Sequence, residues 1–136
     1  MEITQEEKAE LIQRALEARQ YVYAPYSNYA VGAALLTESG DIFHGVNVEN
    51  ASYPLSMCAE RNAVFKAVSR GHKKFRAIVV ATENGGSPCG ACRQVLSEFG
   101  LHTLVITVNG EGQPTLETMV GDLLPAAFRP QDLPTE

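Results

Sequence analysis

Residues 75–99 read FRAIVVATENGGSPCGACRQVLSEF, and they combine a strand, a turn-rich loop and a helix in one stretch. The apolar, β-branched run at 75–81 predicts a buried strand. Two consecutive glycines between an asparagine and a serine predict a flexible loop over 82–88. A helix is expected over 89–99, and the next apolar run predicts another strand over 101–108.

The regions on either side of this stretch add elements of both kinds. Thr4 and Glu7 resemble a capping box, so an amphipathic helix is expected over 5–22. The further elements predicted, in chain order, are a hairpin of strands 31–36 and 42–48, a helix at 58–69, a short strand at 115–119 and a short helix at 120–124. This alternation of helices and strands indicates a layered α/β sandwich around a mixed sheet.

The composition favours a small-molecule substrate. With 136 residues, 45% of them hydrophobic, the chain is expected to form one domain over residues 1–136. The formal net charge of −5 and the lack of a Lys/Arg run argue against a nucleic-acid partner. The charged first twenty residues exclude a secretory signal, and no later apolar run reaches membrane-spanning length. Reduced thiols without an export signal indicate the cytosol.

The cysteines, at Cys58, Cys89 and Cys92, carry the strongest chemical signal. An odd number cannot all form disulfides, whereas a Cys-x-x-Cys pair with one distant thiolate can hold a tetrahedral zinc ion and leave its fourth position open. An open position is what a catalytic zinc ion needs. Glu60, two residues after Cys58, is well placed to exchange protons with water at that position.

The predicted helix starts favour thiolates at these positions. Cys58 and the Cys89/Cys92 pair both fall where free backbone N–H groups and the helix dipole stabilise negative charge. Three thiolates with Zn²⁺ leave a net charge of −1, so a nearby cation would be useful. Arg61 and Arg93 are the candidates, and we expect Arg61 to hydrogen-bond the ligand sulfurs.

Two alternative interpretations of the cysteines remain open from the residues alone. One is a closed structural zinc site completed by a histidine, for which the candidates are His44, His72 and His102. Such a site would leave Glu60 without a role. The other is a dithiol redox pair, because a Cys-x-x-Cys motif that follows a strand and opens a helix also resembles thiol oxidoreductases.

Cys58-Ala59-Glu60 with Pro88-Cys89-Gly90-Ala91-Cys92 resembles the zinc deaminases that act on cytosine or adenine. Similarity to the small cytidine deaminases extends over residues 8–128 and includes Tyr23-Ala24-Pro25-Tyr26-Ser27, Val31-Gly32-Ala33-Ala34-Leu35, Asn47-Val48-Glu49-Asn50-Ala51 and Leu123-Leu124-Pro125. A cysteine as first ligand and a chain of this length are typical of the homotetrameric form. The resemblance implies a three-layer α/β/α sandwich with a mixed five-stranded sheet, one Zn²⁺ per subunit and active sites at subunit interfaces.

The resemblance also implies a reaction, the deamination of cytidine and 2′-deoxycytidine for pyrimidine salvage. Glu60 would take a proton from the zinc-bound water and pass protons to N3 and the departing amine, after hydroxide attacks C4. The backbone N–H of Ala59 would bind the base carbonyl. Asn47 and Glu49 would bind the ribose 3′-hydroxyl.

Aromatic residues complete the site that the resemblance implies. Tyr29 stands where the family commonly has a phenylalanine that lines the sugar pocket, so its hydroxyl must find water or a partner. Phe128 would pack into the neighbouring subunit's site, and Tyr53 could lie at a subunit boundary.

Several other functions compete with cytidine deamination. A deaminase of the nucleoside antibiotic blasticidin S would share the metal motif but not the demand for a free 3′-hydroxyl, so Asn47 and Glu49 favour cytidine. Nucleic-acid editing is disfavoured by the acidic balance. From other classes, a noncatalytic zinc module would show no effect of Glu60→Gln beyond stability. A dithiol oxidoreductase would oxidise reversibly without stoichiometric zinc, and Cys58 would then be accidental.

Overall fold

The computed structural model describes residues 2–134, so Met1, Thr135 and Glu136 of the predicted domain lie outside the described residues. A five-stranded sheet with strand order β2-β1-β3-β4-β5 forms the centre of the fold. The helices are α1 (Gln5–Ala18), α2 (Ala59–Ser69), α3 (Gly90–Glu98) and α4 (Val120–Leu123), and the strands are β1 (Gly32–Thr37), β2 (Ile42–Val46), β3 (Phe75–Ala81), β4 (Leu104–Val108) and β5 (Pro114–Met119). Short 3₁₀ turns occupy Arg19–Tyr21, Tyr53–Leu55 and Pro130–Asp132.

The sheet is mixed, as the sequence predicts. β1 pairs antiparallel with both β2 and β3, β3 pairs parallel with β4, and β4 pairs antiparallel with β5. The parallel pair is connected through α3, which is the crossover helix that parallel strands require. The strand–loop–helix stretch 75–99 therefore leads directly into the centre of the sheet.

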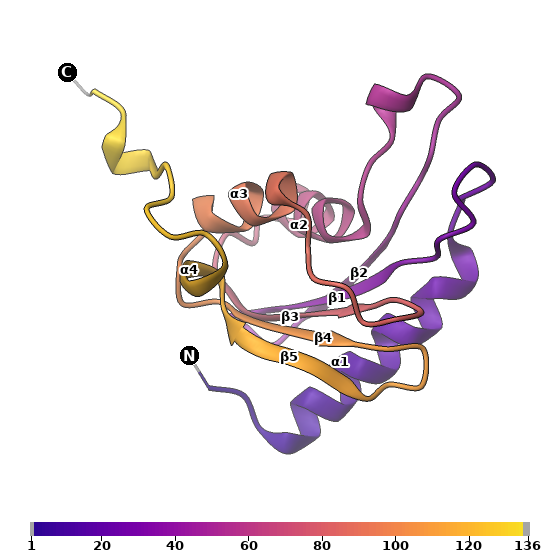
Figure 1. The fold of residues 1–136 in the computed structure, drawn as a ribbon. Coiled ribbons are helices and arrows are strands. Elements are labelled where there is room, and N and C mark those ends of the chain that lie inside the picture. The colour runs from indigo at the N-terminus through magenta and orange to yellow at the C-terminus, as the bar shows by residue number, and fades with distance from the viewer. Residues whose placement is uncertain (1, 135–136) are drawn as a thin grey trace.

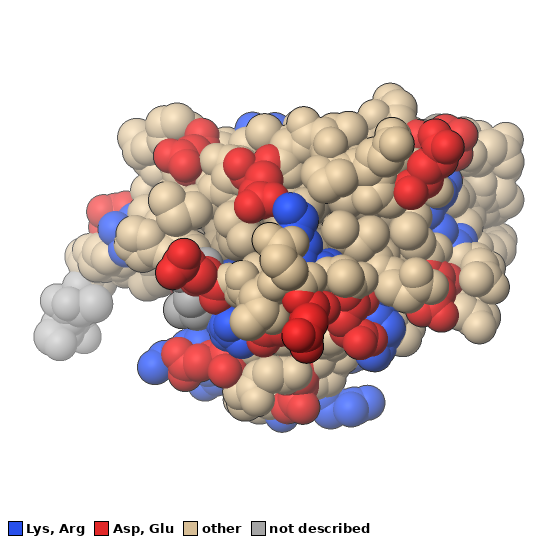
Figure 2. All heavy atoms as spheres, turned by 90° about the horizontal axis from the view of Figure 1, so that it is seen from below, with Lys and Arg blue, Asp and Glu red and all other residues tan. Residues whose placement is uncertain are grey.

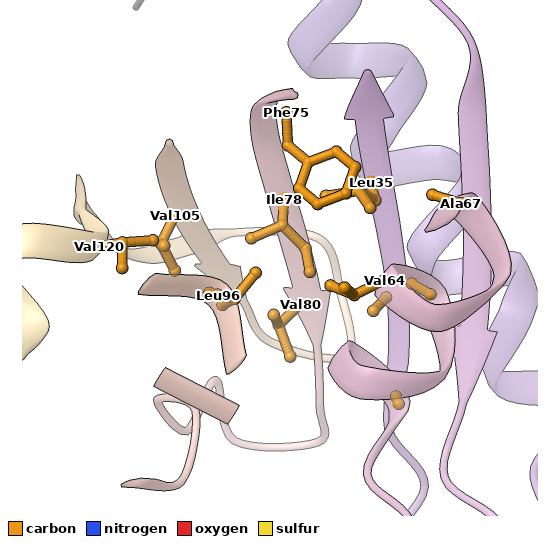
Figure 3. Close-up of a cluster of buried hydrophobic side chains, with 12 residues drawn as sticks. Leu35, Val64, Ala67, Phe75, Ile78, Val80, Leu96, Val105 and Val120 are labelled. Carbon is orange, nitrogen blue, oxygen red and sulfur yellow. The ribbon is translucent and has the colours of Figure 1, made fainter. Parts of the chain in front are cut away.

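Helices cover both faces of the sheet, which confirms the predicted three layers. α1 lies on one face, and α2 and α3 lie side by side on the other (Figure 1). All residues of β1 are buried because both of its faces are covered. Two clusters of buried apolar side chains result, and Figure 3 shows the one on the side of α2 and α3, in which Val64 and Leu96 pack towards Ile78 and Val80.

The predicted boundaries differ from the observed ones mainly at strand and helix ends. The capping box of Thr4 and Glu7 is confirmed at the start of α1, but the helix ends at Ala18 and a 3₁₀ turn follows instead of helix to residue 22. The chain is extended at Val22 because Tyr23 forms a bridge with Val48 beyond the end of β2. β2 accordingly ends before Val48, and β4 begins at 104 because residues 101–102 form a turn.

Charges of both signs are mixed on the surface that can be seen from the side of α1. Lys and Arg side chains are scattered among Asp and Glu on that face, without a continuous basic stripe (Figure 2). Within residues 2–134, no helix combines the length and the apolar character needed to cross a membrane.

Candidate active site

The three cysteines come together at the N-termini of two neighbouring helices. Cys58 is the N-cap residue of α2, Cys89 is the N-cap residue of α3, and Cys92 lies in the first turn of α3. Their sulfur atoms all lie within 4.8 Å of one another, and the Sγ atoms of Cys58 and Cys89 are 3.8 Å apart. Neither N-cap side chain makes a capping hydrogen bond to the backbone of its helix, so both remain available as ligands. The cluster is suited to binding one metal ion.

The electrostatics of the cluster favour a thiolate at Cys58. Hydrogen bonding with Cys92, and then with Arg61 and Cys89, lowers the pKa of Cys58 to about 5, against the opposing effect of burial. The pKa of Cys92 is raised, because its proton is held in the hydrogen bond to Cys58 and because the thiol is buried next to negative charge. A metal ion would replace the shared protons, since metal binding requires deprotonated thiols.

The two candidate arginines, Arg61 and Arg93, make different hydrogen bonds. Arg61 Nη2 donates to Cys58 Sγ at 3.4 Å, and this contact raises the pKa of Arg61. Arg93 instead donates to backbone and side-chain oxygens of the loop before α3 and of α4, namely Pro88 O, Ser87 Oγ and Leu123 O. The expected contact of Arg61 with a ligand sulfur is therefore present, whereas Arg93 ties the metal-binding loop to the end of α4.

Glu60 is a buried carboxyl next to the sulfur atoms. It lies in the first turn of α2 and is only 5% exposed. Burial, reinforced by the negative charge of Cys58, raises the pKa of Glu60 from 4.5 to about 7. A carboxyl with a pKa near neutrality can both accept and release a proton near pH 7, which is what a general acid–base catalyst requires.

A cavity of about 270 Å³ opens beside the sulfur cluster. Most of the predicted site residues line it: Tyr29, Asn47, Glu49, Cys58, Ala59, Glu60 and Cys89. Cys92 is fully buried in the cluster. The cavity lies where three chain segments meet, because Gly32 at the start of β1 pairs with Val46 at the end of β2 and with Ala81 at the end of β3.

Asn47 and Glu49 are held in place by the turn that precedes β1. The Asn47 side chain donates to Tyr29 O at 2.8 Å and accepts from the backbone N–H of Val31 at 2.9 Å. Glu49 accepts hydrogen bonds from the backbone N–H groups of Tyr26 and Ser27 and from the Ser27 hydroxyl. These donors, the Ser27 hydroxyl first, lower the pKa of Glu49, so it is present as a carboxylate.

Phe128 does not line the cavity of its own chain. The residue is 56% exposed, and its carbonyl oxygen accepts a hydrogen bond from Gln94 Nε2 at 2.9 Å. Tyr53 is likewise exposed and packs edge-on against Tyr26.

The cluster of close ligand atoms in residues 2–134 includes no histidine. His72 contacts Asp41, while His44 lies on β2 and His102 in the turn before β4. The fourth ligand of a closed site is therefore not found within the described part of the chain.

Sequence reasoning missed several residues of the cavity wall. Ser27, Thr82, Gly86 and Ser87 all line it. Thr82, Gly86 and Ser87 follow β3 in the loop that leads to Cys89. This loop comes directly before a metal-binding motif, and that position was the signal that could have identified these three residues.

Comparison with known proteins places this site in a family. Residues 5–108 match the family described as "Cytidine and deoxycytidylate deaminase zinc-binding region". The cytidine deaminase of Sporosarcina psychrophila is 47% identical, in an alignment that spans 90% of this chain and 92% of that protein. The probable cytidine deaminase of Dictyostelium discoideum is 46% identical over 96% of this chain and 90% of that protein.

Solved structures agree with the sequence relatives. The crystal structure of cytidine deaminase from Burkholderia pseudomallei matches with a TM-score of 0.84 and 48% identity, over 93% of this chain and 100% of that chain. Given the family match and these identities over nearly the whole length, the chain belongs to the zinc-binding cytidine and deoxycytidylate deaminase family.

Proposed function

We propose that the protein hydrolyses cytidine and 2′-deoxycytidine to uridine and 2′-deoxyuridine, with release of ammonia. The observation that carries this proposal is the position of Glu60, which is buried, has a pKa of about 7 and shares one cavity with the cysteine cluster. A noncatalytic zinc site would not need a destabilised carboxyl at this place. The relatives named cytidine deaminases support the choice of substrate.

Cys58, Cys89 and Cys92 would hold the zinc ion, which would supply the Lewis acidity that makes water a nucleophile near neutral pH. Glu60 would take one proton from the water as the water oxygen forms a bond to C4 of the base, and would deliver that proton to N3. The remaining hydroxyl proton passes through Glu60 to the amino group, and the C4–N bond breaks with loss of ammonia. Glu60 suits both transfers because its pKa lies close to the working pH.

Main-chain and side-chain groups around the cavity would orient the nucleoside. Ala59 is the first residue of α2, so its N–H has no acceptor within the helix and can donate to the base carbonyl. The Glu49 carboxylate and the Asn47 amide would bind the ribose 3′-hydroxyl, as acceptor and donor respectively. Arg61 would offset the negative charge of the thiolates through its hydrogen bond to Cys58.

We further propose a homotetramer whose active sites lie at subunit interfaces. Support comes from large apolar side chains left exposed by the single chain, among them Tyr21, Tyr23, Tyr53, Leu55, Phe65 and Phe128. Phe128 would reach the site of a neighbouring subunit. Light scattering that finds a fully active monomer would exclude both the tetramer and this role of Phe128.

Three further parts of the proposal concern context. Residues 1–136 would form one domain, which the continuous sheet supports. The free cysteines favour the cytoplasm, where thiols stay reduced. The reaction would serve pyrimidine salvage, because it returns a cytosine nucleoside to the uracil series.

The decisive experiment follows loss of cytidine absorbance in the ultraviolet, with zinc content measured on the same samples. Wild type should convert cytidine to uridine, and Glu60→Gln should keep about one zinc ion per chain while turnover falls by two or more orders of magnitude. Blasticidin S is assayed in parallel. Zinc without turnover of cytidine by wild type would refute the proposed substrate, and a fully active Glu60→Gln would refute the role of Glu60.

A further inference from the structure

The backbone of Tyr29 is fixed on both sides of its side chain. Its N–H donates to Ser27 Oγ at 3.1 Å, and its carbonyl oxygen accepts from Asn47 Nδ2 at 2.8 Å. Asn28, directly before it, has a left-handed backbone with φ of 58°, so the chain turns sharply into this position. These contacts leave the Tyr29 ring a narrow choice of directions.

The ring of Tyr29 reaches across to the loop that follows β3. Its hydroxyl donates to Asn84 Oδ1 at 2.7 Å, although the two residues are 55 positions apart in the sequence. The hydroxyl oxygen lies so close to the loop that a Cβ added at Gly86 would be 3.2 Å from it. The tip of the ring therefore bonds Asn84 and occupies the space next to Gly86 that a side chain there would need.

The glycines of this loop are held mainly by two threonines, because Thr115 Oγ1 donates to Gly85 O at 2.8 Å and Thr82 bonds the loop from within. Thr82 Oγ1 accepts from the N–H groups of Gly85 and Gly86 at 2.7 and 2.9 Å, and it also contacts Asn84 Oδ1 at 3.3 Å. Two consecutive glycines make the unfolded loop highly flexible, so each fixed contact removes much conformational freedom. Gly86 and Ser87 line the cavity directly before Cys89.

We propose that Tyr29 is a positioning residue whose hydrogen bond to Asn84 fixes the loop 82–88 as one wall of the substrate cavity. The carbonyl oxygen of Tyr29 is also bonded to Asn47, which lies on the opposite wall of the cavity. Tyr29 therefore sets the spacing between the two walls. A phenyl ring could fill the same space but could not hold the loop. Because the hydroxyl is bonded to the loop and not to a reacting group, its loss should weaken substrate binding and leave the chemical step unchanged.

The test compares Tyr29→Phe, Asn84→Ala and the double variant with wild type, each loaded with zinc. Amide hydrogen exchange at Gly85 and Gly86 reports the order of the loop whether or not cytidine is a substrate. The Michaelis constant and kcat for cytidine then report the cavity, and this part rests on the proposed function. Ser69→Ala is the control, because it removes one hydroxyl hydrogen bond, to Lys66 O at 2.8 Å, at the exposed end of α2 away from the cavity lining.

Each single variant should speed exchange at the two glycines by about 3- to 10-fold and raise KM by a similar factor, the usual range for one lost hydrogen bond. The value of kcat should stay within about two-fold, and the double variant should be no worse than Asn84→Ala alone, because Asn84→Ala already removes the bond to Tyr29 together with the contact to Thr82. Unchanged exchange, additive effects or a loss confined to kcat would overturn the proposal. If wild type failed to deaminate cytidine while exchange still responded as expected, only the proposed function would fall.

Discussion

Burial of the Glu60 carboxyl should contribute a destabilisation of the metal-free protein that grows as pH rises, and Glu60→Gln should remove this contribution. In the unfolded chain the carboxyl loses its proton near its ordinary pKa of 4.5, whereas in the folded protein it keeps the proton up to about pH 7. At Glu60 the folded state therefore binds more protons than the unfolded chain between these values, and the contribution of this carboxyl to stability falls as pH rises through that window.

The magnitude follows from the two pKa values. A rise from 4.5 to about 7 corresponds to about 3 kcal/mol, at about 1.4 kcal/mol for each pKa unit. The penalty should be about 1 kcal/mol at about pH 5, where the unfolded carboxyl has begun to ionise, and close to its full value at about pH 8. Glutamine is neutral throughout, so Glu60→Gln should be the more stable protein, by a margin that grows with pH.

Urea denaturation of both proteins at about pH 5 and pH 8, with a chelator and a reducing agent present, measures this margin. Glu111→Gln removes one negative charge from an exposed turn, and its effect is subtracted as the control. Infrared detection of the protonated carboxyl gives the midpoint directly. A margin that is the same at both pH values, or that favours wild type at the higher one, would show that Glu60 is not held in an environment that disfavours its charge.

Other substitutions test the packing of α2 and the metal site. A Cβ at Gly45 would overlap the carbonyl oxygen of Ala59, so Gly45→Ala should push α2 off the sheet and lower the free energy of unfolding by about 3 kcal/mol. Gly90 has open space around it, so Gly90→Ala should change the free energy of unfolding little. Equal effects of the two substitutions in urea denaturation would contradict this reasoning. Arg61→Ala removes the hydrogen bond to Cys58 Sγ and should lower zinc affinity at least about ten-fold in a chelator competition. Arg61→Lys keeps the charge, so its zinc affinity should lie between those of wild type and Arg61→Ala. Unchanged affinity in Arg61→Ala would argue against charge compensation by this residue.

The metal cluster could be predicted from the sequence because each part of it has a local signal. Cys89 and Cys92 are three residues apart on one helix, and Cys58 opens another helix. Helix starts can be recognised from neighbouring turn residues and from the apolar period that follows. Only the approach of the two helices depends on tertiary structure. That approach could be predicted because a single zinc ion held by all three thiolates requires the two helix starts to lie side by side.

The opposite wall of the cavity could not be predicted in this way. Tyr29 and Asn84 carry no local pattern that links them, and their contact depends on which strands are neighbours in the sheet. A reader of the sequence can expect a hairpin of β1 and β2, but the antiparallel pairing of β1 with β3 joins strands that are separated by a whole helix. Without that pairing, the hydroxyl of Tyr29 remains a group whose partner is unknown.

Strand register then explains why one position serves both walls. Gly32 pairs with Val46 on one side and with Ala81 on the other, so the residues just before β1 must lie beside those just after β2 and those just after β3. Asn47 follows β2 directly, and Asn84 follows β3 by three residues. The side chains of β1 alternate between the two buried clusters, with Ala33 and Leu35 in one and Ala34 and Leu36 in the other. A register slip of one residue would exchange them between the clusters and separate these partners, so the packing of β1 fixes the geometry of the cavity as well as the core.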